Sequence, residues 1–74
     1  MTEVVDCRGL ACPMPVVQLA KRLKVMKAGE EVELLADAPG SKTDVLAWCR
    51  RTGNTLVEFQ DNGGFFSYLV RKSE

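Results

Sequence analysis

A chain of 74 residues with ten basic and ten acidic side chains carries no formal net charge. Proteins whose main activity is nucleic-acid binding usually have a basic excess, so this balance argues against that class. So short a chain can bury only one small core, and we expect a single domain over residues 1–74. The sequence has no apolar stretch of membrane-spanning length and no basic leader followed by an apolar segment, and we expect a cytoplasmic protein.

The first half of the chain predicts a strand, a helix and a second strand. A short strand ends near Asp6, and a loop follows it. Apolar residues recur at helical spacing from Pro13 to about Lys27, and Gly29 matches a signal for the end of a helix. Residues 31–36 alternate between apolar and polar side chains, which is typical of a strand with one buried face.

The second half predicts a helix followed by a hairpin. The segment Ser41–Asp44 resembles a capping box, and the helix that follows it ends at Gly53. Residues 55–60 and 65–71 are expected to form strands, joined by a turn over residues 61–64. Trp48 and Cys49 lie on the apolar face of this helix, and we expect both in the core.

The predicted order is strand, helix, strand, helix, strand, strand. Two helices can cover only one face of a four-stranded sheet, so we expect an α/β (α+β) two-layer sandwich. The sheet should be mixed. Its last two strands form an antiparallel hairpin, and the crossover helix favours parallel pairing of the first two.

The segment Cys12-Pro13-Met14-Pro15 lies where a loop becomes a helix. Proline is favoured at the first helical position, which would make Cys12 the N-cap, with its sulfur facing unpaired backbone N–H groups. Such a position stabilises the reactive thiolate. Pro15 falls in the first turn and would make the start of the helix rigid. Met14 should be exposed. The alternative is that Cys12 is only a cap, but cysteine is a poor capping residue.

Several kinds of chemistry are excluded by what the chain lacks. It contains no histidine, so neither a Cys–His nucleophile pair nor a credible zinc site can be assembled, and we expect no metal and no cofactor. Three cysteines make an odd count, which argues against a framework of disulfides. An isolated nucleophile without a base fits a covalent carrier better than a stand-alone enzyme. The thiolate of Cys12 would accept a sulfur atom as a persulfide and surrender it to an acceptor.

Cys7 lies five residues before Cys12, and its role is open. It is either a second thiol that forms a disulfide with Cys12 or a small residue at the end of the first strand. The spacing alone does not show whether the two Cα atoms come close enough for a disulfide.

The residues around Cys12 match a family pattern, D-x-x-G-x-x-C-P-x-P, formed by Asp6, Gly9 and the segment Cys12–Pro15. The match continues through residues 36–44, 48–53 and 68–72. Over nearly its whole length the chain resembles the TusA-type (SirA-like) sulfur carrier proteins. The resemblance implies the same two-layer sandwich, which is similar to the C-terminal domain of translation initiation factor three.

The resemblance also implies a role for each residue of the pattern. Cys12 would be the persulfide-bearing residue, Pro13 and Pro15 would shape its presentation, and Asp6 and Gly9 would support it. The donor would be a cysteine desulfurase or a rhodanese-type protein, and the acceptor a DsrE-like protein. The sulfur would serve tRNA thiolation, molybdenum cofactor assembly or dissimilatory sulfur trafficking.

Two other functions remain as alternatives. The first is a thiol–disulfide redox protein that uses Cys7 and Cys12, and the second is a regulatory protein-binding module in which the cysteine is incidental. For the carrier we expect a monomer when free, because transient docking needs no large permanent interface.

Overall fold

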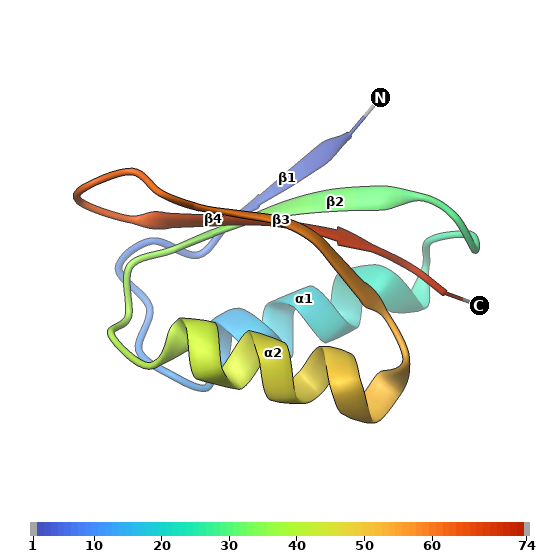
Figure 1. Ribbon diagram of the computed structural model, residues 1–74, viewed down its shortest axis with the longest axis horizontal. Helices are drawn as coiled ribbons and strands as arrows, with labels where there is room; N and C mark the ends of the chain where they lie inside the picture. Colours follow the sequence, from blue (N-terminus) through green and yellow to red (C-terminus); the bar gives the residue numbers. More distant parts are fainter. Residues whose placement is uncertain (1, 74) are drawn as a thin grey trace.

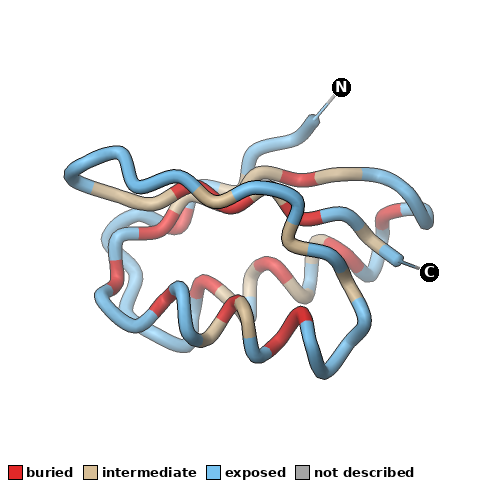
Figure 2. The backbone as a smooth tube through the Cα atoms, in the orientation of Figure 1, coloured by how far each residue is buried: buried red, intermediate tan, exposed pale blue. Residues whose placement is uncertain are grey.

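The structure, a computed structural model, describes residues 2–73. Both helices lie on the same side of one sheet, and the termini emerge at the same end (Figure 1). The buried residues lie between the two layers (Figure 2). The elements are β1 (Glu3–Asp6), α1 (Met14–Lys24), β2 (Glu31–Ala36), α2 (Ser41–Thr52), β3 (Thr55–Asp61) and β4 (Phe66–Arg71). The predicted two-layer sandwich is confirmed.

The four strands are arranged in the order β1-β2-β4-β3. β1 and β2 are parallel, with Val5 opposite Leu34, and β4 is antiparallel to both β2 and β3. The expected mixed sheet is therefore correct in both pairings. An Arg71–Glu31 ion pair of 2.7 Å joins β4 to β2 at one end of the sheet.

The core lies between the helix-facing side of the sheet and the two helices. Alternation along β2 and β4 turns Leu34 and Tyr68 toward the helices, and both are completely buried. Trp48 and Cys49 belong to this core, as predicted. The other buried apolar members of the cluster are Cys7, Leu19, Leu23, Met26, Val32, Ala36, Val45 and Val70.

A β-bulge interrupts the alternation of β3. The register against β4 shifts between Leu56 and Glu58, so Val57 is the extra residue and is 40% exposed. The bulge allows Leu56 and Phe59, three residues apart, to pack against the core together. In a regular strand, where successive side chains point to opposite faces, residues three apart could not both lie on one face.

Three details of the predicted elements are wrong. α1 ends at Lys24 rather than near Lys27, and Gly29, with φ +88°, lies in the turn before β2. The capping box does not form, because Gly40 is the N-cap of α2 and no side chain caps it. The Ser41 hydroxyl is instead hydrogen-bonded to the Tyr68 hydroxyl at 2.6 Å, and both residues are completely buried.

Within residues 2–73, neither helix has the length and apolar composition needed to cross a membrane.

Candidate functional site

The loop that carries Cys12 is fixed at its start by β1 and by Asp37. The Cys7 N–H donates to the Leu35 carbonyl at 2.7 Å, which extends the pairing of β1 with β2. Gly9 then adopts φ +86°, and its N–H donates to both carboxylate oxygens of Asp37 at 3.0 Å. Only glycine adopts this backbone conformation without strain. The loop before α1 is thereby held against the loop before α2 (Figure 1).

Asp6 supports the loop through Arg8 and does not contact the thiol. The Arg8 backbone N–H and its guanidinium both donate to the Asp6 carboxylate, at distances of 2.8 to 3.1 Å. These hydrogen bonds lower the pKa of Asp6 to about 2. The Arg8 guanidinium also lies 5.0 Å from the centre of the Phe65 ring. Asp6 therefore orders the start of the loop.

The two prolines define the start of α1, but Cys12 is not its N-cap. The N-cap is Pro13, and no side chain caps the helix. Pro15 is completely buried and lies in the first turn, where its missing N–H costs nothing. The expectation that the Cys12 sulfur faces the N-terminus of α1 is wrong, because the helix begins one residue later than predicted.

The sulfur of Cys12 lies instead against the N-terminus of α2. Cys12 is exposed, and a methyl group added to Gly40 would be 3.9 Å from its Sγ. The Gly40 N–H and the carboxylate of Asp44, in the first turn of α2, both act on the pKa of this thiol. The nucleophile therefore precedes α1 in the sequence but lies near the N-terminus of α2 in space.

The environment raises the pKa of Cys12, contrary to the expected lowering. The largest cause is the hydrogen bond from the thiol to the Asp44 carboxylate, followed by partial desolvation and by the negative charge of Asp44. Only the Gly40 N–H acts in the opposite direction. A helix N-terminus stabilises a thiolate when no anion competes, and here a carboxylate within the same turn reverses that effect.

A buried pair of hydroxyls lies beneath this site. Burial raises the pKa of Tyr68, and the neighbouring Cys12 and Asp44 raise it further. The Ser41 hydroxyl, bonded to the Tyr68 hydroxyl, is in the residue next to Gly40. This bond ties the first residue of α2 to β4, so it fixes the part of the helix that the sulfur contacts.

The other two thiols are inaccessible. Cys7 is 1% exposed and Cys49 is 5% exposed, and burial raises the pKa of both. All three cysteines are free. No group of three metal-ligating side chains occurs among residues 2–73.

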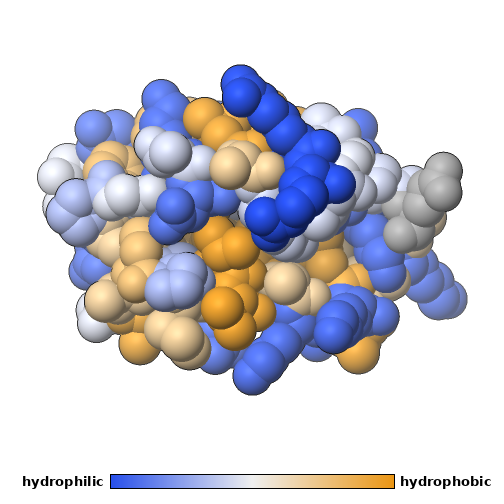
Figure 3. All heavy atoms as spheres, turned by 90° about the horizontal axis from the view of Figure 1, so that it is seen from below, coloured by the Kyte–Doolittle hydropathy of each residue, from blue (hydrophilic) through white to orange (hydrophobic). Residues whose placement is uncertain are grey.

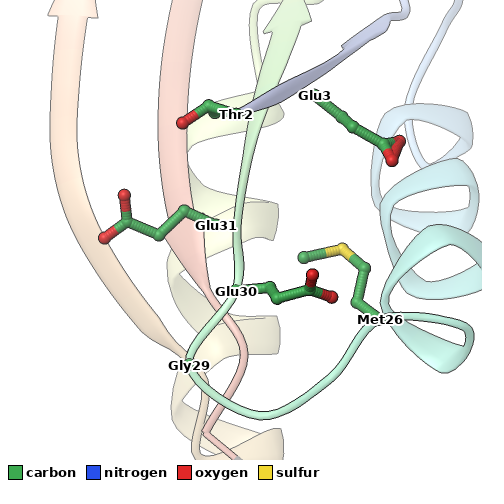
Figure 4. Close-up of a pocket in the computed structure, with 6 residues that line it drawn as sticks. All are labelled: Thr2, Glu3, Met26, Gly29, Glu30 and Glu31. Atoms are coloured by element: carbon green, nitrogen blue, oxygen red, sulfur yellow. The ribbon is translucent and has the colours of Figure 1, made fainter.

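A hollow at the end of the sheet opposite to Cys12 is acidic (Figure 4). Its volume is about 270 Å³. Its three carboxylates already have partners within the chain: Glu3 pairs with Arg22, Glu31 with Arg71, and Glu30 accepts from a backbone N–H. Such a set does not favour a cation, and the hollow is remote from Cys12.

Exposed apolar residues lie close to Cys12 in the sequence. Leu10 and Met14 are each 39% exposed and Val17 is 36% exposed, so the predicted exposure of Met14 is confirmed. Figure 3 shows apolar atoms gathered between polar margins on the helix-covered side of the molecule. Leu10 precedes Cys12 in the loop, and Met14 and Val17 lie one turn apart on α1. An exposed thiol beside apolar side chains fits a surface that meets another protein.

Comparison with known proteins identifies the family. The family described as Sulfurtransferase TusA matches residues 3–72. The chain belongs to the TusA family. The sulfur carrier protein TusA of Allochromatium vinosum is 39% identical over 71 residues, which are 96% of this chain and 93% of that protein.

A second relative is longer. YrkF of Bacillus subtilis is 42% identical over 71 residues, which are 96% of this chain, and the match spans 38% of YrkF. A SirA-like protein of Desulfitobacterium hafniense has the same fold, with a TM-score of 0.83. It is 24% identical, and the match covers 99% of this chain and all of that one. Membership of the TusA (SirA-like) family, expected from the sequence, is confirmed.

The sequence pattern located the thiol but missed most of what surrounds it. Gly40, Asp44 and Tyr68 come from a helix and a strand distant in the chain, and no local spacing connects them to Cys12. The available signal was the segment 36–44, which matched the family pattern. Within it, Ser41 and Asp44 were interpreted as parts of a cap.

Proposed function

We propose that this protein is a sulfur carrier that binds a sulfur atom as a persulfide on Cys12 and passes it between partner proteins. The observation that carries the proposal is the contrast in accessibility: Cys12 is exposed, whereas Cys7 and Cys49 are buried. The family and the name of its Allochromatium vinosum relative support the same function.

Loading is an exchange that needs neither an oxidant nor a reductant. The Cys12 sulfur attacks the outer sulfur of a persulfide on the donor, and a new S–S bond forms. The S–S bond of the donor breaks, and its electron pair leaves with the donor sulfur. The proton that Cys12 loses ends on that donor thiolate. Unloading is the same exchange with an acceptor thiol as the attacking group.

The absence of histidine from the chain is consistent with this role, because no imidazole is available to take the thiol proton. The groups that act on the pKa of Cys12 are the Gly40 N–H and the Asp44 carboxylate. We therefore infer that donor and acceptor proteins supply the remaining groups. Their contact surface would include Leu10, Met14 and Val17, which are exposed and close to Cys12 in the sequence. The donor would be a desulfurase or a rhodanese-type protein, and the acceptor a DsrE-like or similar thiol protein.

The redox alternative receives less support. A disulfide between Cys7 and Cys12 would require the Cys7 sulfur, now 1% exposed in the core, to move to the surface. Burial also disfavours the thiolate that disulfide exchange needs.

The other alternative, a regulatory binding module, differs from the carrier in its response to Cys12→Ala. The binding module would still bind its partner, whereas the carrier would no longer transfer sulfur.

The direct test is loading with labelled sulfur. The protein is incubated with a cysteine desulfurase and radiolabelled cysteine, and protein-bound label is measured after removal of small molecules. The proposal predicts loading of the native chain and of the Cys7→Ser and Cys49→Ser variants, and no loading of Cys12→Ser. Equal label on Cys12→Ser would refute it.

A further inference from the structure

The two layers of the molecule carry opposite net charges, although the whole chain carries none. The helices α1 and α2 contain six basic side chains and one acidic side chain, Asp44, which gives a net charge of +5. The four strands contain six acidic side chains and one basic side chain, Arg71, which gives −5. The helix layer and the sheet are therefore complementary in charge.

The outer face of the sheet, which points away from the helices, carries carboxylates without cationic partners. No element of the described chain covers this face (Figure 1). The strand register places Glu33, Leu69 and Glu58 side by side across β2, β4 and β3. All three lie on the outer face, because the residue that follows each of them packs in the core. Glu33 and Glu58 form no ion pair among residues 2–73.

A hollow lies on this row of three residues. Its volume is about 270 Å³, and Glu33, Glu58 and Leu69 line it together with Thr2, Gln60 and Ser67. The backbones of the two glutamates are separated by two strand spacings, about 9.5 Å. An apolar side chain between two carboxylates fits the long stem and the charged head of a lysine or an arginine.

The outer surface of the helix layer carries cations that also lack partners. Lys21 and Lys24 lie one turn apart on the exposed side of α1, and Arg50 and Arg51 are exposed in the last turn of α2. None of the four forms an ion pair among residues 2–73. Neighbouring helices pack about 8–10 Å apart, which is close to the spacing of the two glutamates. Cations on both helices can therefore reach carboxylates on both strands.

The charges distinguish between the ways in which two copies could meet. Two outer sheet faces would bring carboxylates together, two helix layers would bring cations together, and both arrangements are unfavourable. The helix layer of one copy against the outer sheet face of another brings opposite charges together. The sheet face spans the longest and shortest extents of the molecule, 30 and 18 Å (Figure 1), so a flat contact buries about 1,100 Å² over both partners, as weak and transient interfaces do.

We propose that the outer face of the sheet docks the helix layer of a second copy of this chain. The exposed cations of one copy approach Glu33 and Glu58 of the next, on either side of Leu69. The contact is head-to-tail and leaves one free layer at each end, so short chains of copies grow with protein concentration. Salt screens such a contact, so the monomer expected from the sequence should predominate at physiological ionic strength.

This self-association does not depend on the carrier function, but it affects the same helix. Met14 and Val17 share the exposed side of α1 with Lys21 and Lys24, at helical spacing. A copy that docks on the helix layer therefore covers them. It would compete with the partner surface proposed above.

The first test is sedimentation equilibrium of the native chain, with protein concentrations up to millimolar and a reductant that prevents disulfide-linked dimers. At about 10 mM salt, where the Debye length is about 30 Å, the weight-average mass should rise above that of the monomer as the concentration increases. At about 1 M salt it should return to that of the monomer. A monomer at every concentration in low salt, or an association that salt strengthens, would overturn the inference.

The second test exchanges the charges of the two surfaces. Glu33→Lys/Glu58→Lys makes the sheet row basic, and Lys21→Glu/Lys24→Glu makes the exposed side of α1 acidic. Each variant alone should self-associate at least about fivefold more weakly than the native chain in low salt, because like charges then meet. An equimolar mixture of the two should associate again, because opposite charges meet between variants. A mixture that remains monomeric, or variants as associated as the native chain, would contradict the proposed contact.

A matched control makes the same change in net charge away from the row. Glu30 lies in the turn before β2 and Asp61 at the end of β3, and neither lines the hollow. Glu30→Lys/Asp61→Lys should associate at least about threefold more strongly than Glu33→Lys/Glu58→Lys. Equal weakening in both would show that net charge, rather than this face, controls the association.

Mapping on the native chain keeps the inference testable if a variant does not fold. In low salt, amide NMR signals should shift with protein concentration on both layers, at Leu35 and Leu69 in the sheet and at Lys21 and Arg50 in the helices. Shifts confined to one layer would indicate a symmetric contact of like faces and overturn the head-to-tail arrangement. None of these measurements uses a sulfur donor, so their outcomes are independent of sulfur loading.

Discussion

The Cys12 sulfur lies beside the backbone of Gly40, at the N-terminus of α2, although Cys12 directly precedes the N-cap of α1. The two loops that meet here follow β1 and β2, which are adjacent parallel strands. Parallel neighbours end at the same edge of a sheet, so their loops meet there. The loop that carries the family pattern and the loop within residues 36–44 thus form one site.

The Gly40 N–H should stabilise the thiolate of Cys12. Gly40→Pro removes this donor, and Gly40 already has φ −92°, within reach of a proline ring. We expect the alkylation profile of Cys12 to move to higher pH in this variant. Gly40→Ala keeps the N–H and is the control. A profile that moves equally in both variants would show that the side chain, rather than the N–H, is responsible.

The Ser41–Tyr68 pair should stabilise the fold. Tyr68→Phe leaves the buried Ser41 hydroxyl without its partner, and Ser41→Ala does the same to Tyr68, so each should cost about 1–3 kcal/mol in the free energy of unfolding. The double variant should cost less than the sum of the two single variants, because no unpaired hydroxyl remains. Urea unfolding of the four proteins measures this coupling. Strict additivity would contradict it.

Gly9 and Gly29 offer a comparison between the site and the rest of the fold. Both have a positive φ, +86° and +88°, and open space where a methyl group would lie. Alanine at either position should cost about 1–2 kcal/mol, because both force a side chain into the left-handed region. Only Gly9→Ala should also slow sulfur loading, since the Gly9 N–H holds the Cys12 loop to Asp37. Equal loading rates would separate that contact from the function.

Asp6 should contribute to stability in acid. Its pKa in the folded protein is about 2, below the ordinary 3.8, so the folded state binds this proton less readily than the unfolded state does. The contribution is complete above pH 4 and disappears as the pH falls from about 4 to about 2. Thermal unfolding across this range should decline less steeply in Asp6→Asn. An identical decline in the variant would mean that the Arg8 contact does not act on Asp6 in solution.

Native alkylation should modify one thiol per chain. Cys7 and Cys49 are buried and their thiols have raised pKa values, so only Cys12 should react before unfolding. In denaturant, two further groups should be added. Rapid modification of Cys7 in the native protein would revive the redox alternative.

The sequence was sufficient for the fold because its patterns are local. The alternation of residues 31–36 and the helical spacing after Pro13 each specify one element, and the short connections leave few topologies. Patterns of this kind fail where tertiary contacts decide. Ser41 resembles a cap, but the Tyr68 hydroxyl takes its side chain, and the bulge at Val57 appears only when β3 pairs with β4.

The site was predictable to the level of one residue. Cys12 is marked by the prolines that follow it, whereas the direction of its pKa depends on Asp44, thirty-two positions later in the chain. From the sequence alone we expected the sulfur at the start of α1, missed Asp44, and therefore expected a lowered rather than a raised pKa.

The most direct test of the central claim is intact-protein mass spectrometry after incubation with a cysteine desulfurase and cysteine. We expect the native chain to gain the mass of one sulfur atom, a reductant to remove it, and Cys12→Ser to gain none. A gain that persists in Cys12→Ser, or a native chain that instead loses two hydrogens through a Cys7–Cys12 disulfide, would contradict it.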